Sequence, residues 1–525
     1  MEETHRSSWS LSDLTHATML RYAAQAVGLL SNLLLTPFLL RELGKSDYGL
    51  WLLMMSLVSL LYFLELGMSD SLVRTIAAHR ASGTLIEARP VVANGLLLSI
   101  GVASVTTLLV VTNQSALLRV VTVTSDQEAA FSSLIFAGLV LFWAGLLAGV
   151  PDAVLLSTKH FARSNVIDVG AAVANAGLTW AAVGLGHGLV GLAGVTAATS
   201  CLSTTLKLLS VHRAVPELSP SLRHISWTHE AWRPLSKPLA WTSLIYLADI
   251  VSYHFDLLVV GSLLSTSVVA ALSIAFRIPS ILMAFARTAF STLFPYSADL
   301  YGRSDIAGLR RSLLLSTRIA LMLTLLGLIV FWYAGPMLLE LWVGPIEQGT
   351  ILLRLGLILN VVFNGFIAVE MILYGCGDVR SLATINVVGA FVNLPLTIVL
   401  VRSIGVAGPL LATIAGGILV SSLSASRAAR LVNLSVGEFC RAAVFWPLAA
   451  LGPVVIVALV LETMQVEQDG ILLGATAVAA SAYVAVGVFS AFAHEERVQA
   501  LGVALAISRR VVWLCDEQRR RFARR

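Results

Sequence analysis

Polar and charged side chains recur at helical spacing within apolar stretches of the chain. Arg21, Gln25 and Asn32 are four and seven residues apart, which places them on one face of a helix. A later stretch carries Arg277 and Arg287, ten residues apart and broadly on one side. Inside a membrane an arginine costs about 2.5–3.5 kcal/mol, and its planar fork suits a phosphate. These five residues predict a water-filled cavity that binds a diphosphate.

Three acidic residues, Asp249, Asp256 and Glu370, also lie in apolar stretches. Asp249 and Asp256 are seven residues apart and therefore share a helical face. A carboxylate within a membrane can bind a coupling proton or Na⁺. It can equally neutralise an arginine, and the arginines themselves can extend to the headgroups or pair across helices. The sequence leaves these alternatives open.

The elements that position these residues are membrane helices. Only 12% of the 525 residues are charged, about half the share in soluble domains, and the mean hydropathy is +0.85. Apolar runs of about twenty residues recur, each long enough to cross a ~30 Å hydrocarbon core. We predict an all-α, polytopic membrane protein. Its fourteen helices are expected at 18–40, 48–70, 91–112, 129–150, 164–184, 189–210, 238–261, 268–296, 313–334, 350–374, 383–401, 407–426, 442–461 and 470–492.

The basic residues orient these helices. With the N-terminus inside, 25 of the 35 Lys and Arg residues lie in cytoplasmic segments and 4 in outer loops. That bias follows the positive-inside rule and predicts two cytoplasmic termini. Because the basic residues lie between apolar runs and in the tail, they indicate membrane topology and not nucleic-acid binding. No cleaved export signal is apparent, and the four cysteines share no short spacing, so we expect no disulfide framework, metal site or cofactor.

The chain contains a weak internal repeat. Residues 72–89 align with 293–310 at an offset of 221. Asp168, Asn175 and Thr179 align with Asn386, Asn393 and Thr397 at an offset of 218, and GLAG at 191–194 aligns with GVAG at 405–408. Since the displacement spans an even number of helices, both copies have the same orientation, and we expect a parallel pseudo-two-fold axis along the membrane normal.

The repeat divides the chain into two six-helix lobes with additions. The expected parts are a cytoplasmic N-terminal segment (1–17), an N-lobe (18–211), a cytoplasmic linker (212–237), a C-lobe (238–430), two further helices (431–492) and a basic cytoplasmic tail (493–525).

Several motifs resemble those of a known superfamily. Residues 37–51 (PFLLRELGKSDYGLW), 64–68 (LELGM), 72–77 (LVRTIA) and 294–297 (FPYS) resemble polysaccharide transporters of the multidrug/oligosaccharidyl-lipid/polysaccharide (MOP) flippase superfamily, in the O-antigen flippase branch. The likeness covers about residues 18–430. It implies alternating access between two lobes in the bacterial inner membrane, and an arginine-lined cavity that receives the diphosphate.

The resemblance implies export of an undecaprenyl-diphosphate-linked oligosaccharide for O-antigen, capsule or exopolysaccharide. The expected partners are that lipid-linked oligosaccharide, membrane lipids, a coupling proton or Na⁺, and polysaccharide polymerases. A cation-coupled multidrug antiporter is the alternative, although the first helix lacks the acid that many drug exporters keep there. A membrane polymerase is disfavoured because the outer loops are short and leave no room for a catalytic domain, so we expect no enzyme.

Overall fold

The computed structural model describes residues 11–65, 67–114, 128–228, 232, 248, 255–463 and 469–491. Within these residues the chain is all-α and has no strand, which confirms the predicted fold class. The chain forms two compact units. Unit 1 contains residues Met1–Arg277, Leu339–Leu355 and Val379–Val420, and unit 2 contains Ile278–Leu338, Gly356–Asp378 and Ser421–Arg525.

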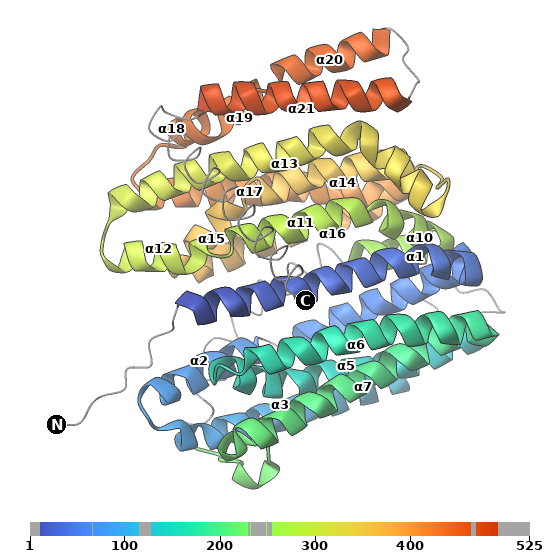
Figure 1. The fold of residues 1–525 in the computed structure, drawn as a ribbon, viewed down its shortest axis with the longest axis vertical. Helices are drawn as coiled ribbons and strands as arrows, with labels where there is room; N and C mark the ends of the chain where they lie inside the picture. Colours follow the sequence, from blue (N-terminus) through green and yellow to red (C-terminus); the bar gives the residue numbers. More distant parts are fainter. Residues whose placement is uncertain are drawn as a thin grey trace, which may run out of the picture. The chain divides into compact units, whose positions relative to one another are not determined.

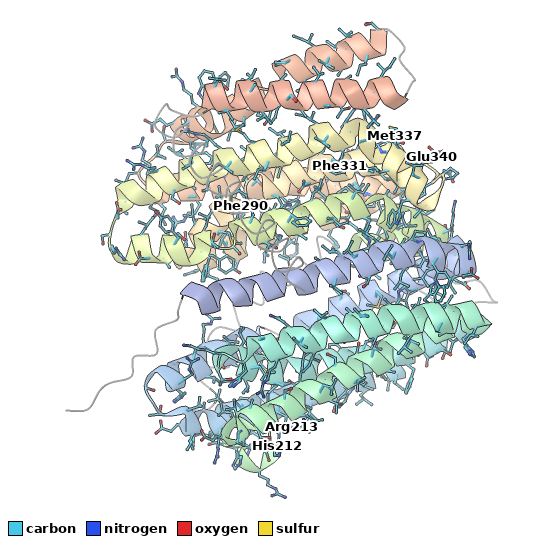
Figure 2. The ribbon with its side chains drawn as sticks, in the orientation of Figure 1. His212, Arg213, Phe290, Phe331, Met337 and Glu340 are labelled. Carbon is cyan, nitrogen blue, oxygen red and sulfur yellow. The ribbon has the colours of Figure 1, made fainter. Side chains whose placement is uncertain are left out.

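Unit 1 is built on helices from both parts of the repeat. They are α1 (Leu11–Leu61), α2 (Met68–Ala81), α3 (Arg89–Thr112), α5 (Glu128–Ser157), α6 (Phe161–Ala182), α7 (Gly188–Ala214), α10 (Thr266–Ala275), α16 (Val379–Ile404) and the first half of α17 (Gly408–Leu431). Helices α5, α6 and α7 run side by side (Figure 1). The last turn of α7 carries His212 and Arg213 (Figure 2). A basic side chain there interacts favourably with the negative end of the helix dipole.

Helix α1 contains the helix that the sequence predicts at 18–40 and most of the one predicted at 48–70, which ends at Leu61. They are joined by a kink at Gly44, whose φ of 79° is not helical. Glycine adopts this angle without steric cost because it has no Cβ. Within α1, Pro37 has no N–H to donate to the carbonyl of Leu33. The indole Nε1 of Trp342 donates to that carbonyl instead, at 2.7 Å. The proline is therefore tolerated because a side chain from α13 (Ile306–Val343) satisfies the freed acceptor.

Unit 2 contains the remaining helices. They are α11 (Arg277–Phe290), α12 (Leu293–Gly302), most of α13, α14 (Gly349–Asn364), α15 (Ile367–Gly375), the end of α17, α18 (Val436–Phe439), α19 (Trp446–Ala449), α20 (Gly452–Thr463) and α21 (Asp469–Ala491). Helices α20 and α21 pack against one another (Figure 1). Tyr483 of α21 is fully buried in a cluster with Leu325 and Ile329 of α13.

Nine apolar segments of the described chain are long enough to cross a membrane, and α10 with α11 forms a tenth if that bent pair is one span. The segments Ala26–Leu61, Ala162–Ala214 and Val379–Leu431 each contain two of the predicted helices. The protein is therefore a multi-pass membrane protein. The predicted helix at 238–261 lies largely outside the described residues, so the total of fourteen stays a prediction.

Helix α2 is a finding that hydropathy did not predict. Its sequence, MSDSLVRTIAAHRA, was expected to lead from the second helix into a cytoplasmic connection. The structure forms a helix there because Leu72 and Ile76, one turn apart, are fully buried against Val92 and Val154. A short amphipathic helix of this kind has too few apolar residues to register as a membrane span.

The repeat predicted from the sequence is visible in how its helices end. Gly83 after α2 and Ser304 after α12 both have positive φ, 76° and 58°, at the predicted offset of 221. In each copy the next backbone N–H donates back to a carbonyl five residues earlier, at 2.9 Å from Thr84 and 3.0 Å from Asp305. This left-handed helix cap needs a positive φ, and its recurrence supports the alignment of the two copies.

Candidate functional site

A polar cavity of about 350 Å³ lies within unit 1, between α1, α5, α6 and α7. Most of the residues that line it are small or carry a hydroxyl or amide group. The residues that contribute polar groups are Ser31, Asn32, Tyr62, Asp168, Asn175, Thr196, Thr199, Ser200, Ser203 and Thr204. Such a wall offers many hydrogen bonds and one carboxylate, so it suits a polar group within a membrane protein.

One edge of this cavity depends on a close helix contact. Tyr62 donates its phenol hydrogen to the carbonyl of Leu141 at 2.9 Å. A Cβ on Gly145 would lie only 2.0 Å from the Tyr62 oxygen, so glycine is required for the tyrosine to reach α5. The phenol thereby closes the cavity without leaving its own hydroxyl unsatisfied.

A three-residue ion cluster adjoins the cavity. The Nζ atom of Lys207 in α7 lies 2.7 Å from Asp152 Oδ2 in α5 and 2.8 Å from Asp168 Oδ1 in α6. Ser164 also donates to Asp152. The lysine side chain is only 6% exposed, and it meets two carboxylates, so the cluster has a formal charge of −1. Because Asp168 also lines the cavity, one carboxylate of the cluster faces its polar space.

An asparagine-to-threonine hydrogen bond joins α6 to α7 and recurs in the second copy. Asn175 Nδ2 donates to Thr199 Oγ1 at 2.9 Å, and Asn393 Nδ2 of α16 donates to Thr413 Oγ1 of α17 at 2.8 Å. The asparagines are 218 residues apart and the threonines 214, the two offsets that the sequence motifs gave. The corresponding helix pairs of the two copies are therefore joined by a hydrogen bond at the corresponding position.

Only the second of these bridges contacts an acid. Asp256 is 7% exposed and accepts hydrogen bonds from Thr397 at 3.0 Å and Thr413 at 2.7 Å. No Lys, Arg or His among the described residues forms an ion pair with Asp256. A buried carboxylate without a counter-charge is costly, and the binding of a proton or Na⁺ at Asp256 stays a prediction.

The chain resembles known transporters in sequence and in fold. Residues 242–399, which include Asp256, Asn393 and Thr397, match the family model MatE. The structure is similar to an inward-facing multidrug resistance MATE family transporter of the MOP superfamily, with 16% identity and a TM-score of 0.64 over 79% of this chain and 98% of that one. No curated protein matches the chain.

A lipid II flippase, MurJ, in an inward closed conformation has a TM-score of 0.68 at 12% identity, over 90% of this chain and 98% of that one. The MatE match covers less than half of the chain, and the two solved structures are similar to it in fold. A further MOP superfamily transporter, from Pyrococcus furiosus, is 17% identical with a TM-score of 0.56, over 80% of this chain and 95% of that one. At these identities the solved structures show the shared fold alone.

One of the three residues predicted on the first helix has a described side chain. Asn32 lines the polar cavity and donates to the carbonyl of Gly28 at 2.9 Å. The side chains of Arg21 and Gln25 lie outside the described residues, as does Asp249. The predicted grouping of Arg21, Gln25 and Asn32 therefore stays a prediction.

The second set of predicted residues lies elsewhere along the chain. Arg277 begins α11 and is half-buried, whereas Arg287 in the last turn of α11 is exposed. Arg287 interacts electrostatically with Glu370 of α15, within unit 2. Neither arginine is among the residues that line the polar cavity. Arg287 is therefore an arginine that Glu370 can neutralise, the alternative that the sequence left open. A role of Glu370 in ion coupling stays a prediction.

Sequence reasoning did not identify the Lys207 cluster. Lys207 falls within the predicted helix at 189–210, and Asp152 lies just beyond the predicted helix at 129–150. The sequence does show a lysine within the apolar stretch that forms α7. A lysine inside a membrane requires an acidic partner. The partners themselves are 39 and 55 residues away, so only the packing of α5, α6 and α7 reveals them.

Proposed function

We propose that this protein is a flippase of the MOP superfamily that moves an undecaprenyl-diphosphate-linked oligosaccharide from the cytoplasmic to the outer face of a bacterial inner membrane. The observation that carries the proposal is the extent of the likeness to the lipid II flippase. That structure matches 90% of this chain, against 79–80% for the multidrug resistance MATE transporters. The protein is proposed to act as a carrier and not as an enzyme.

The site chemistry supports a lipid-linked sugar as cargo. The polar cavity of unit 1 presents hydroxyl and amide groups, which match the hydroxyl groups of a sugar. Arg21 and Arg277 are proposed to hold the diphosphate, because a guanidinium stays charged and donates two hydrogen bonds to phosphate oxygens. Asp256 with Thr397 and Thr413 is proposed to bind the coupling cation.

A deletion strain tests the function directly. We expect cells without this protein to accumulate the lipid-linked oligosaccharide on the cytoplasmic face. A charged diphosphate does not cross the hydrocarbon core without a carrier. The measurement is extraction and mass spectrometry of undecaprenyl-linked sugars, with protection from an added glycosidase reporting the side of the membrane. A deletion strain with ordinary lipid-linked sugar levels and intact surface polysaccharide would contradict the proposal.

Arg277 provides a residue-level test. Replacing Arg277 with alanine is expected to reduce export at least about a hundredfold, because a lost bidentate, charge-assisted contact to phosphate is worth about 3 kcal/mol. Lysine should restore export only in part, since it keeps the charge and loses the fork. Protein level and membrane insertion are measured alongside. Normal export by Arg277→Ala, or loss of the protein itself, would assign Arg277 a structural role.

A cation-coupled multidrug antiporter is the second candidate function. The MatE match favours it, because the matched residues include Asp256, Asn393 and Thr397 of the proposed cation site. If the protein is such an antiporter, we expect the deletion strain to become sensitive to cationic drugs and dyes, with no change in lipid-linked sugars. The two functions are thus separated by the same strain.

A further inference from the structure

A second and larger cavity, of about 640 Å³, lies in unit 1 apart from the polar one. Its walls come from α1 around the Gly44 bend, from the start of α10, from the end of α13 with the turn after it, and from Val406 after α16. The predicted topology assigns each of these turns to the outer face of the membrane. The cavity therefore lies where four outer turns meet, and its placement rests on the proposed topology.

Most of this wall is apolar. Leu40, Leu264, Val268 and Ile346 line it, and Trp342 is fixed there by its hydrogen bond to the carbonyl of Leu33. Tryptophan is favoured at the level of the lipid headgroups, where its ring is apolar and its N–H is polar. A volume of this size is within the range of pockets that hold a lipid headgroup and the first carbons of its chains.

The charged residues of the rim define what the cavity can hold. Arg41 is already matched, because its Nε and Nη2 atoms lie 3.1 and 3.0 Å from Glu42 Oε1. Lys45 and Glu347 also line the cavity, and neither forms an ion pair with any residue of the described chain. The rim thus presents one unmatched positive and one unmatched negative charge.

We propose that this cavity binds a phospholipid with a primary ammonium group, such as phosphatidylethanolamine. Lys45, with the remaining donors of Arg41, takes the phosphate, and Glu347 accepts hydrogen bonds from the ammonium group. The apolar wall takes the glycerol backbone and the first acyl carbons. A net-neutral rim disfavours an anionic lipid, and a quaternary ammonium group has no hydrogen to donate to Glu347.

The test uses the full chain in vesicles of equal parts phosphatidylethanolamine, phosphatidylglycerol and phosphatidylcholine. After extraction in mild detergent, native mass spectrometry counts the phospholipids that remain bound. We expect phosphatidylethanolamine to be retained over the other two. Lys45→Ala and Glu347→Ala should each reduce its retention about fivefold, the effect of one exposed ion pair. Retention of phosphatidylglycerol or phosphatidylcholine at an equal or higher level overturns the proposal.

Two further variants serve as controls. Arg402→Ala removes an exposed basic residue from the last turn of α16, which does not line this cavity, and should leave retention unchanged. Ala271→Trp fills the cavity from α10 and should abolish retention while the rim charges remain. Loss of retention in Arg402→Ala, or undiminished retention in Ala271→Trp, places the lipid elsewhere. The assay measures binding without transport, so its failure is distinct from failure of the proposed export function.

Discussion

Replacing Asp256 with asparagine is expected to weaken the cation binding that we propose at this residue while the fold is kept. Asparagine has the same shape and can still accept a hydrogen bond from Thr397, but it has no charge to attract a cation. We expect the apparent cation affinity to fall at least about tenfold, which corresponds to about 1.4 kcal/mol. The measurement is the rise in melting temperature when NaCl replaces choline chloride, because a bound cation stabilises the folded state.

The repeat supplies a matched control for this prediction. Thr397→Val removes a donor to Asp256 and should weaken the cation effect, whereas Thr179→Val alters the corresponding threonine of the first copy. Thr179 is fully buried, and its hydroxyl has no hydrogen-bond partner among the described residues. Its replacement should therefore leave the response to Na⁺ unchanged. A full response to Na⁺ and to pH in Asp256→Asn would place the coupling site elsewhere.

The two copies of the repeat differ at one chemical position. Both fasten their helix pair with an asparagine-to-threonine hydrogen bond, but only Thr413 goes on to contact a buried acid. Each threonine hydroxyl also lies within hydrogen-bond distance of the carbonyl four residues earlier, Val195 for Thr199 and Pro409 for Thr413, and Thr199 lines the polar cavity. We infer that the copies have separate tasks, with cation binding at Asp256 and polar cargo in the cavity of the first copy.

Much of the fold was predictable because membrane helices are defined by their own sequence. Helix α3 was expected at 91–112 and runs over Arg89–Thr112, and α21 was expected at 470–492 and runs over Asp469–Ala491. The repeat was also predictable, since its marker residues include glycines and asparagines with fixed backbone and hydrogen-bonding roles. Helix α2 was not predicted, because its burial depends on packing against α3 and α5 and not on hydropathy.

The candidate sites were harder to predict than the helices. The sequence identified Asp256 as a buried acid but could not show which hydroxyls would face it, since Thr397 and Thr413 are 141 and 157 residues away. Asn32 lines the polar cavity, and its predicted role in binding substrate stays a prediction. Periodicity gives the face of a helix, whereas the partner across the bundle depends on how the helices pack.

Replacing Lys207 with methionine is expected to destabilise unit 1 by about 2 kcal/mol. Asp152 and Asp168 then face each other without the ammonium group that lies 2.7 and 2.8 Å from them. Removing one partner from a buried ion pair costs about 3–5 kcal/mol. The two carboxylates are 36% and 46% exposed, so solvent screening reduces that cost. The measurement is the melting temperature of the purified protein in detergent at low and high salt.

Two further variants separate charge from packing at Lys207. Lys207→Arg keeps the positive charge and should retain most of the stability. Lys207→Met combined with Asp168→Asn removes the ammonium group and one carboxylate together, and it should be more stable than Lys207→Met alone. That recovery is expected only if repulsion between Asp152 and Asp168 causes the loss. If the double variant is as unstable as the sum of its parts, the lysine acts through the packing of its aliphatic chain against α5 and α6.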